Sequence, residues 1–275
     1  MLDAFLDSLI DSLKLIPFLF VSFLLMEALE HKSLKGSEKI LGSSRKLGPL
    51  IGGLLGAIPQ CGFSTLVTNL YVSRVVTLGT LISVYLSTSD EMLPILLSSH
   101  AESGTVLKLV LSKLIIGVIY GYLIDLFYRK KFDREEYDIC SKDHCHCEKG
   151  ILYSATIHTL KTIFYIFIIV FVLNILINLV GESNFAKIFL KDNLFAPFLS
   201  ALFGLIPNCA ASVMLTELYL KGAINFASVL AGTLSASGVS LLVLFRTNKN
   251  KKENMNILLL TYLLGAITGF VINLF

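Results

Sequence analysis

The second half of this chain repeats the first half at a constant offset of 148 residues, and the register holds without a gap to the last residue. The repeated features include a short polar run, Leu86-Ser87-Thr88-Ser89 in the first copy and Leu234-Ser235-Ala236-Ser237 in the second. The matched single positions include Pro49 and Pro197, Gly56 and Gly204, Pro59 and Pro207, Cys61 and Cys209, Ser64 and Ser212, and Tyr71 and Tyr219. Many membrane transporters are built from two such copies and hold their substrate where the copies meet.

Hydrophobic residues make up 55% of the chain, and its mean hydropathy is +0.76. The apolar runs that are long enough to cross roughly 30 Å of hydrocarbon are Ile10–Glu30, Leu47–Val72, Val75–Leu97, Val106–Phe127, Thr159–Val180, Leu194–Leu220, Ala223–Phe245 and Asn256–Phe275. We therefore expect an all-α polytopic membrane protein embedded in a lipid bilayer, and this composition argues against a soluble enzyme. The net charge of +3 lies mostly in loops, and no basic patch with interleaved aromatic residues indicates a nucleic-acid partner. The sequence leaves open whether the chain forms a homo-oligomer.

Lysine and arginine gather in three places, at Lys32–Lys46, Arg129–Arg134 and Arg246–Lys252. The positive-inside rule assigns all three clusters to the cytoplasm. One crossing precedes the first cluster, so each copy must contain an odd number of crossings for the clusters to share a side. Two copies with odd numbers of crossings face opposite ways, and the sequence therefore predicts inverted repeats with both chain ends outside.

The odd number requires that one apolar run in each copy does not make a single ordinary crossing. The candidates are Val75–Leu97 and Ala223–Phe245, which carry polar or small residues at their centres. Each run would form only about 35 Å of helix, which fits either one full crossing or a hairpin of two half-helices. We expect hairpins, giving about five hydrophobic segments in each copy, with polar tips that line a cavity because their backbone groups need partners at membrane depth.

Proline should break the helices near Pro59 and Pro207, since it removes a backbone donor and clashes with the preceding turn. Such breaks free carbonyl groups on one side and positive helix ends on the other. The alternative is that these segments carry small residues only so that helices can pack closely. The acids Asp90 and Glu217 add charge within apolar runs, where charge is costly and usually functional, although Glu217 also suits a position near water. The predicted substrate path comprises Pro59, Gln60, Cys61, Ser64, Ser87, Ser89, Asp90, Pro207, Asn208, Cys209, Ser212, Glu217, Ser235 and Ser237.

A polar linker, residues 129–157, separates membrane repeat 1 (residues 1–128) from membrane repeat 2 (residues 158–275). It carries thiols and imidazoles at Cys140, His144, Cys145, His146 and Cys147. These groups suit zinc, copper(I) and trivalent arsenic, but their spacing differs from that of a zinc finger. We interpret the cluster as a flexible cytoplasmic site that senses or delivers metal; the alternative is a charged linker that binds none. No permanently bound cofactor is expected, only a transported or sensed metal ion.

The duplicated Pro-x-Cys breaks, the Leu-Ser-x-Ser tips and the His-Cys-His-Cys linker resemble the ten-transmembrane heavy-metal exporter family. The resemblance covers essentially the whole chain and rests on the segment from Gly56 to Ser64, on Pro207-Asn208-Cys209 and on the linker cluster. Members are labelled arsenic efflux protein or manganese transporter. The resemblance therefore implies export of a metal or metalloid across the cell membrane of a bacterium or archaeon. A fainter similarity links the chain to organoarsenical permeases, which have more cysteines in their Pro-x-Cys segment.

Three functions remain open at this point. The first is a secondary exporter of a metal cation or metalloid, and not an enzyme, because the chain has no Walker-type phosphate-binding motif and hence no ATPase of its own. The second is a transporter of an organic or anionic solute, gripped by the N-terminal ends of half-helices. The third is an intramembrane thiol oxidoreductase that uses Cys61 and Cys209, which would require Cα atoms within about 7 Å of each other.

Overall fold

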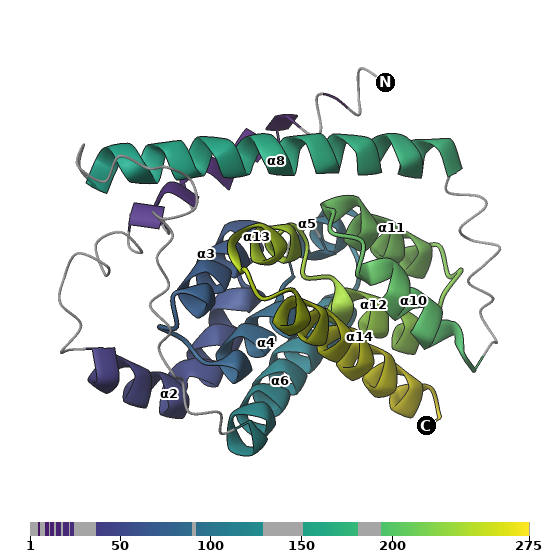
Figure 1. Ribbon diagram of the computed structural model, residues 1–275. Helices are drawn as coiled ribbons and strands as arrows, with labels where there is room; N and C mark the ends of the chain where they lie inside the picture. Colours follow the sequence, from purple (N-terminus) through teal and green to yellow (C-terminus); the bar gives the residue numbers. More distant parts are fainter. Residues whose placement is uncertain are drawn as a thin grey trace.

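The computed structural model describes residues 37–89, 92–128, 151–180 and 194–274, and single residues or short stretches near the N-terminus at positions 5, 9, 10, 12, 13, 15–17, 19–21, 23 and 24. All regular secondary structure in these residues is helical (Figure 1). The segments that are long and apolar enough to cross a membrane are Ser103–Phe127, Ala155–Val172, Phe226–Thr247 and Lys251–Asn273. The expectation of an all-helical, multi-pass membrane protein is confirmed for the described part of the chain.

Five described helices of the first copy each have a counterpart in the second copy. The first copy contains α2 (Ser37–Ala57), α3 (Cys61–Val72), α4 (Leu78–Ser87), α5 (Met92–Ser98) and α6 (Ser103–Phe127). The second contains α10 (Ala196–Gly204), α11 (Cys209–Leu220), α12 (Phe226–Ser235), α13 (Ser240–Thr247) and α14 (Lys251–Asn273). At the offset of 148 residues, the bounds of α3 and α11 coincide, and so do those of α4 and α12.

Proline and polar residues stand between the short helices of each copy. Pro59 lies between the end of α2 at Ala57 and the start of α3 at Cys61, and Pro207 lies between α10 and α11. Each run that was expected to form a hairpin contains two short helices, α4 with α5 and α12 with α13. At ten residues, α4 and α12 are each about 15 Å long on their own, and α12 together with α13 makes up the apolar segment Phe226–Thr247 named above.

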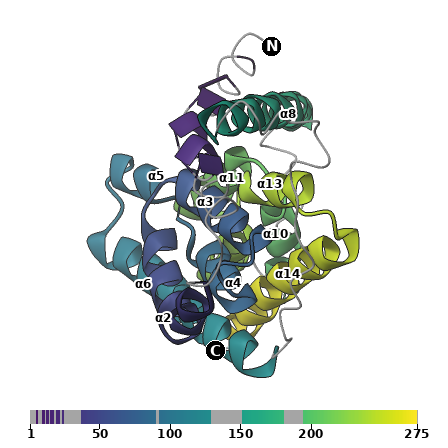
Figure 2. The same ribbon diagram turned by 60° about the vertical axis from the view of Figure 1, so that its left-hand side comes forward.

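The helices lie in layers. A long helix, α8 (Ile151–Val180), lies over one face, and α3, α5, α11 and α13 lie directly beneath it (Figures 1 and 2). The described N-terminal residues run beside α8, where Leu15 and Leu19 share an apolar cluster with Ile166 and Val170. Helices α2, α6 and α14 lie on the side away from α8, and the fully buried α4 lies at the centre with its counterpart α12. The described polar residues that follow α4 and α12, Thr88, Ser89 and Ser237, are buried.

Small residues allow the helices of each copy to approach closely. In the first copy, α4 packs against α2 and α6; in the second copy, α12 packs against α10 and α14. The closest approach is at Gly204 of α10, where an added Cβ atom would lie 2.0 Å from the carbonyl oxygen of Gly232 in α12. Gly56, the counterpart of Gly204, faces Val84 and Ser87 of α4. This small-residue packing is typical of helices that associate in membranes.

The contacts between the copies are reciprocal. Helix α3 of the first copy packs against α13 of the second, and α11 of the second packs against α5 of the first. Helices α4 and α12 contact each other directly. The hydroxyl groups of Tyr120 and Thr268, which occupy equivalent positions in the two copies, lie 3.0 Å apart. Each copy therefore presents the same elements to the other.

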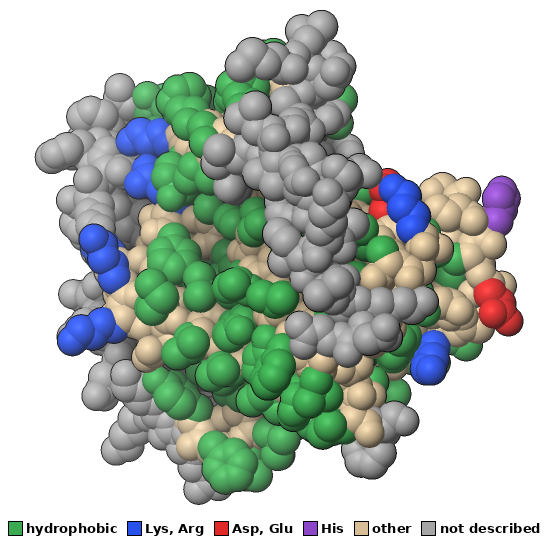
Figure 3. Space-filling model, turned by 90° about the vertical axis from the view of Figure 1, so that its right-hand side faces the viewer, with side chains coloured by type: hydrophobic (Ala, Val, Ile, Leu, Met, Phe, Trp, Pro, Cys, Tyr) green, Lys and Arg blue, Asp and Glu red, His purple; other side chains and the backbone are tan. Residues whose placement is uncertain are grey.

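The outer surface is suited to lipid. Figure 3 shows one broad apolar face on which charged side chains gather at the borders. On α6, the exposed apolar residues recur every four positions, at Leu107, Leu111, Ile115 and Ile119. The counterparts of the last three on α14, Leu259, Leu263 and Ile267, are also exposed. A stripe of this kind on a helix long enough to span a bilayer has hydrocarbon as its natural environment.

Candidate functional site

A small cavity lies between the two copies, with room for about one water molecule. The first copy contributes the end of α4, the start of α5 and the middle of α6; the second contributes the start of α11 and the loop between α12 and α13. The lining residues are Thr88, Ser89, Met92, Lys113, Asn208, Cys209, Ser212, Ala236 and Gly238. The structure thus brings together four residues of the predicted substrate path, Ser89, Asn208, Cys209 and Ser212.

Asn208 places its amide group at the positive end of a helix. It is the N-cap of α11, with extended backbone angles, and its Oδ1 accepts a hydrogen bond from the backbone N–H of Ala210 at 3.2 Å. This bond satisfies one of the donors that every helix start leaves unpaired. The thiol of Cys209 and the hydroxyl of Ser212 follow on the buried side of the same helix, and Ser212 Oγ donates to the carbonyl oxygen of Cys209 at 2.8 Å.

The break in the first copy is arranged differently. Gln60 also has extended backbone angles at the start of α3, but its side chain makes no capping hydrogen bond and is exposed, as is Pro59. The extra methylene of glutamine explains the difference, because asparagine caps a helix start well and glutamine does not. Ser64 is buried, and its carbonyl oxygen accepts a bond from Thr68 Oγ1 at 2.6 Å. The side chain of Cys61 lies outside the described residues. The two breaks therefore contribute unequally to the cavity.

The serines at the ends of α4 and α12 and just after them also differ between the copies. In the first copy, Ser87 Oγ donates to the carbonyl oxygen of Ser83 at 2.8 Å, and Ser89 Oγ to that of Ser87 at 3.1 Å. In the second copy, the hydroxyls of Ser235 and Ser237 are buried and have no hydrogen-bond partner among the described residues. Ser87, Ser235 and Ser237 do not line the cavity, so Ser89 is the one serine of these four that the structure places in its wall.

Lys113 is the cavity residue that the sequence reasoning missed. It belongs to the buried stripe of α6 and is 1% exposed. Its Nζ donates to the main-chain carbonyl oxygens of Thr88 and, at 2.9 Å, Thr233. The signal was present in the sequence, because a lysine in the middle of an apolar run is costly in a membrane and is usually functional.

Other predicted residues do not meet at the cavity. Glu217 does not line it: its Oε2 lies 3.1 Å from Nζ of Lys221, and the side chains are 38% and 59% exposed respectively. Position 217 faces away from the buried side of α11, so the alternative reading of a position near water describes its surroundings. Asp90 and the linker cluster of Cys140, His144, Cys145, His146 and Cys147 lie outside the described residues. Within the described ranges, no three His, Cys, Asp or Glu side chains are grouped so that they could hold a metal ion.

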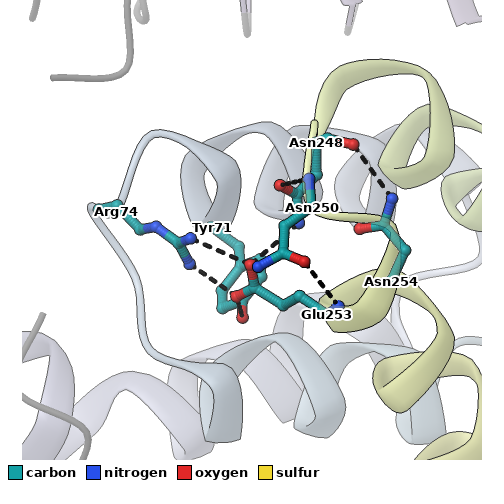
Figure 4. Close-up of polar contacts among 6 residues, drawn as sticks. All are labelled: Tyr71, Arg74, Asn248, Asn250, Glu253 and Asn254. Carbon is teal, nitrogen blue, oxygen red and sulfur yellow. Dashed lines mark hydrogen bonds and ion pairs between the residues drawn. The ribbon is translucent and has the colours of Figure 1, made fainter. Parts of the chain in front are cut away.

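A second polar cluster links the copies away from the cavity (Figure 4). Arg74, in the turn after α3, binds Glu253 of α14 through two hydrogen bonds, Nη1 to Oε1 at 2.8 Å and Nη2 to Oε2 at 3.0 Å. The hydroxyl of Tyr71 and the amide of Asn248 also donate to the carboxylate of Glu253. A paired, partly buried carboxylate of this kind is held more firmly than a single surface ion pair.

We expect the Arg74–Glu253 pair to contribute about 1–2 kcal/mol of coupling free energy, because its bonds are bidentate and partly shielded from water. A double-mutant cycle with Arg74→Gln and Glu253→Gln, followed by thermal unfolding in detergent, measures this value. The exposed pair Lys221–Glu217 is the matched control, and its cycle should give about 0.3–0.5 kcal/mol. Equal coupling free energies in the two cycles would show that the Arg74–Glu253 pair holds the copies together no more strongly than an exposed ion pair would.

Comparison with known families gives one result. A family model described as "Putative, 10TM heavy-metal exporter" matches residues 1–189 and, in a second match, residues 170–275. The two matches together span the chain. No curated protein matches this sequence, and no solved structure matches it.

Proposed function

Because the chain belongs to the ten-transmembrane heavy-metal exporter family, we propose that it is a secondary transporter that exports a metal cation or metalloid through the cavity between its two copies. The observation that carries the proposal is the composition of the cavity wall: both copies supply residues to it, and the polar ones come from a helix start and a hairpin tip. Transporters with repeated halves bind substrate at such positions.

We further infer that the copies are inverted and that the protein lies in the plasma membrane of a prokaryote. The three basic clusters support this orientation, with the linker in the cytoplasm and both ends outside. The reciprocal packing of α3 on α13 and of α11 on α5 supports a two-fold relation between the copies. The contact between Tyr120 and Thr268 supports an axis that passes near these equivalent positions.

The chemistry of the cavity suits a soft or borderline metal. Cys209 offers a thiol, Asn208 an amide oxygen, and Ser89 and Ser212 offer hydroxyl groups. Thiols favour zinc, copper(I) and trivalent arsenic, whereas oxygen ligands favour manganese. The linker cluster, in this proposal, collects or senses metal in the cytoplasm and does not form part of the crossing.

Purified protein in liposomes provides the test. We expect uptake of at least one ion among manganese, zinc, nickel and arsenite, above the level of protein-free liposomes, with binding of the same ion to the protein in detergent. Nickel and zinc prefer nitrogen and sulfur ligands, so selective uptake of manganese would assign the oxygen groups as ligands, and selective uptake of arsenite the thiol. Failure to move or bind any of the four would refute the proposal.

A transporter of an organic or anionic solute is the second candidate. It is favoured by one observation, the position of the cavity at the N-terminal end of α11, where the helix dipole attracts negative charge. The same liposomes discriminate the two: if carboxylate or phosphate compounds were taken up and the four metal species were not, the anion transporter would replace the metal exporter.

A further inference from the structure

A second and much larger hollow lies on the outside of the molecule, between α6 of the first copy and α14 of the second. Its volume is about 700 Å³, whereas the cavity between the copies has room for about one water molecule. The two helices meet where Tyr120 contacts Thr268, and the hollow runs from this contact toward the end of α6 and the start of α14. We call it the α6–α14 groove. Clefts of roughly 300–1,000 Å³ are the usual size of sites that bind organic molecules.

The walls of the groove are apolar and exposed. Leu123 and Phe127 of α6 line one wall, and Leu259 and Leu263 of α14 line the other; all four are exposed. Both helices are segments long and apolar enough to cross a membrane. The groove therefore opens toward the hydrocarbon of the bilayer, which supplies acyl chains to fill it.

The length of the groove matches one leaflet of a bilayer. Along α14 its lining runs from Lys252 to Leu264, a rise of about 18 Å at 1.5 Å per residue. One leaflet supplies about 15 Å of hydrocarbon, half of the roughly 30 Å core. The buried residues Tyr71 and Leu78 close the groove on its inner side. A single phospholipid can thus lie in it with its headgroup level with Lys252.

The polar end of the groove carries unbalanced positive charge. Its lining includes one carboxylate, Glu253, and one ammonium group, Lys252. The carboxylate already accepts bonds from Arg74, Tyr71 and Asn248 (Figure 4), so its charge is balanced within the protein. Lys252 is exposed and forms no ion pair with the described residues. Negative charge on a ligand would complement it.

From this complementarity we propose that the α6–α14 groove binds one anionic phospholipid, with its acyl chains between the two helices and its phosphate group at Lys252. Basic pockets between spanning helices on the cytoplasmic side bind anionic headgroups. In the proposed orientation, the end of α6 and the start of α14 face the cytoplasm, where the leaflet carries anionic lipid. Tyr128 lines the groove at the end of α6, a position where tyrosine meets the headgroup region. The lipid would contact both copies, whichever ion the protein exports.

The repeat does not require a lysine at this place. The counterpart of Lys252 is Gly104, and the counterpart of Leu78 is Phe226. The ring of Phe226 lies 4.5 Å from Nζ of Lys108, so that lysine has an aromatic partner where the first copy offers an apolar wall. The exposed lysine of the groove is therefore specific to one end of the helix pair, as a site for the lipid of one leaflet requires.

Two substitutions test the headgroup and the chains separately. Lys252→Gln removes the positive charge, and its control is Lys108→Gln, an exposed lysine that does not line the groove. Leu123→Trp fills the groove, and its control is Leu111→Trp on the same helix; the two leucines are 42% and 44% exposed, and Leu111 does not line the groove. Native mass spectrometry of delipidated full-length protein in detergent measures binding of phosphatidylglycerol, of phosphatidylcholine with the same chains, and of glycerol phosphate. Thermal unfolding shows that each variant is folded.

We expect the wild type and both controls to retain one phosphatidylglycerol with about fivefold or greater preference over phosphatidylcholine, the effect of one basic residue near an anionic headgroup. Lys252→Gln should lose this preference, and Leu123→Trp should lose the bound lipid. Glycerol phosphate, which has the charge but no chains, should not bind.

Equal binding of the two lipids by the wild type, or an unchanged preference in Lys252→Gln, would overturn the proposal. Undiminished lipid binding by Leu123→Trp would place the lipid elsewhere, and binding of glycerol phosphate as tight as that of the lipid would make the groove a site for soluble anions. A dimer that Leu123→Trp dissociates and Leu111→Trp does not would assign the groove to a second copy of the chain instead. The measurement uses no transported metal, so each of these outcomes leaves the proposed function to its own test.

Discussion

Replacing Gly204 with alanine is expected to destabilise the protein by about 3 kcal/mol or more, enough to leave little folded protein in the membrane. The new Cβ atom would lie 2.0 Å from the carbonyl oxygen of Gly232 and 2.9 Å from its carbonyl carbon. Both atoms belong to the backbone of α12, which cannot move without displacing the central helices. Yield of monodisperse protein and thermal unfolding in detergent measure the effect.

Gly104→Ala is the matched control. Gly104 is exposed in the first turn of α6, and an added Cβ atom there has no heavy atom nearer than 4.0 Å. The substitution should be neutral or stabilise the protein by up to about 1 kcal/mol, since alanine favours helix. Gly56→Ala should fall between the two, because its nearest neighbour is a side-chain atom, Ser87 Oγ, although the backbone carbonyl oxygen of Val84 also lies 2.7 Å from the new Cβ atom. If Gly204→Ala unfolded at the wild-type temperature, the close approach of α10 and α12 would be wrong.

Asn208→Ala is expected to abolish most transport even at saturating substrate. The change removes a buried amide from the cavity wall and also removes the cap of α11, which costs about 1 kcal/mol. Asn208→Ser separates these effects, because serine also caps a helix start but has no amide. We expect Asn208→Ser to be as stable as the wild type and still impaired in transport, measured by metal uptake into liposomes.

Asn225→Ala removes a helix cap away from the cavity, together with one side-chain bond, because Asn225 Nδ2 also donates to Asn273 Oδ1 at 2.7 Å. Asn225 caps α12 by accepting a bond from the N–H of Ser228 at 2.8 Å, and it does not line the cavity. Asn225→Ala should lose at least as much stability as Asn208→Ala, about 1–2 kcal/mol, and keep most of its transport. Gln60→Ala should also keep more transport than Asn208→Ala, because Gln60 is exposed. Equal losses in all three variants would mean that the cavity is not where substrate crosses.

The helical framework could be predicted from the repeat, because proline and small polar residues mark the same places in both copies. The bounds of α3 and α11, and those of α4 and α12, coincide at the offset of the repeat. Differences between the copies were harder to predict, since they depend on single side chains. The pattern treats Gln60 and Asn208 as equivalents, yet only the shorter side chain caps its helix.

Whether Lys113 and Glu217 line the cavity depends on tertiary packing, which the sequence does not show. Lys113 interrupts an apolar run, which the sequence shows, but its bonds to two carbonyl groups from different copies depend on tertiary packing. Glu217 was included because it interrupts an apolar run, but the face of α11 on which it lies is partly exposed and carries Lys221 one turn later. A repeat predicts which elements meet, whereas the rotation of each helix decides which side chains line the space between them.

The most direct test of the central claim, that substrate crosses between the copies and not through the linker, compares metal uptake by two variants in the same liposomes. One is Asn208→Ser, and the other carries Cys145→Ser and Cys147→Ser. We expect the linker variant to match the wild type at saturating substrate, although a peptide spanning residues 138–150 with the same changes should bind metal more weakly. Asn208→Ser should remain impaired at every substrate concentration. The opposite order, with the linker thiols essential and Asn208 dispensable, would contradict the account.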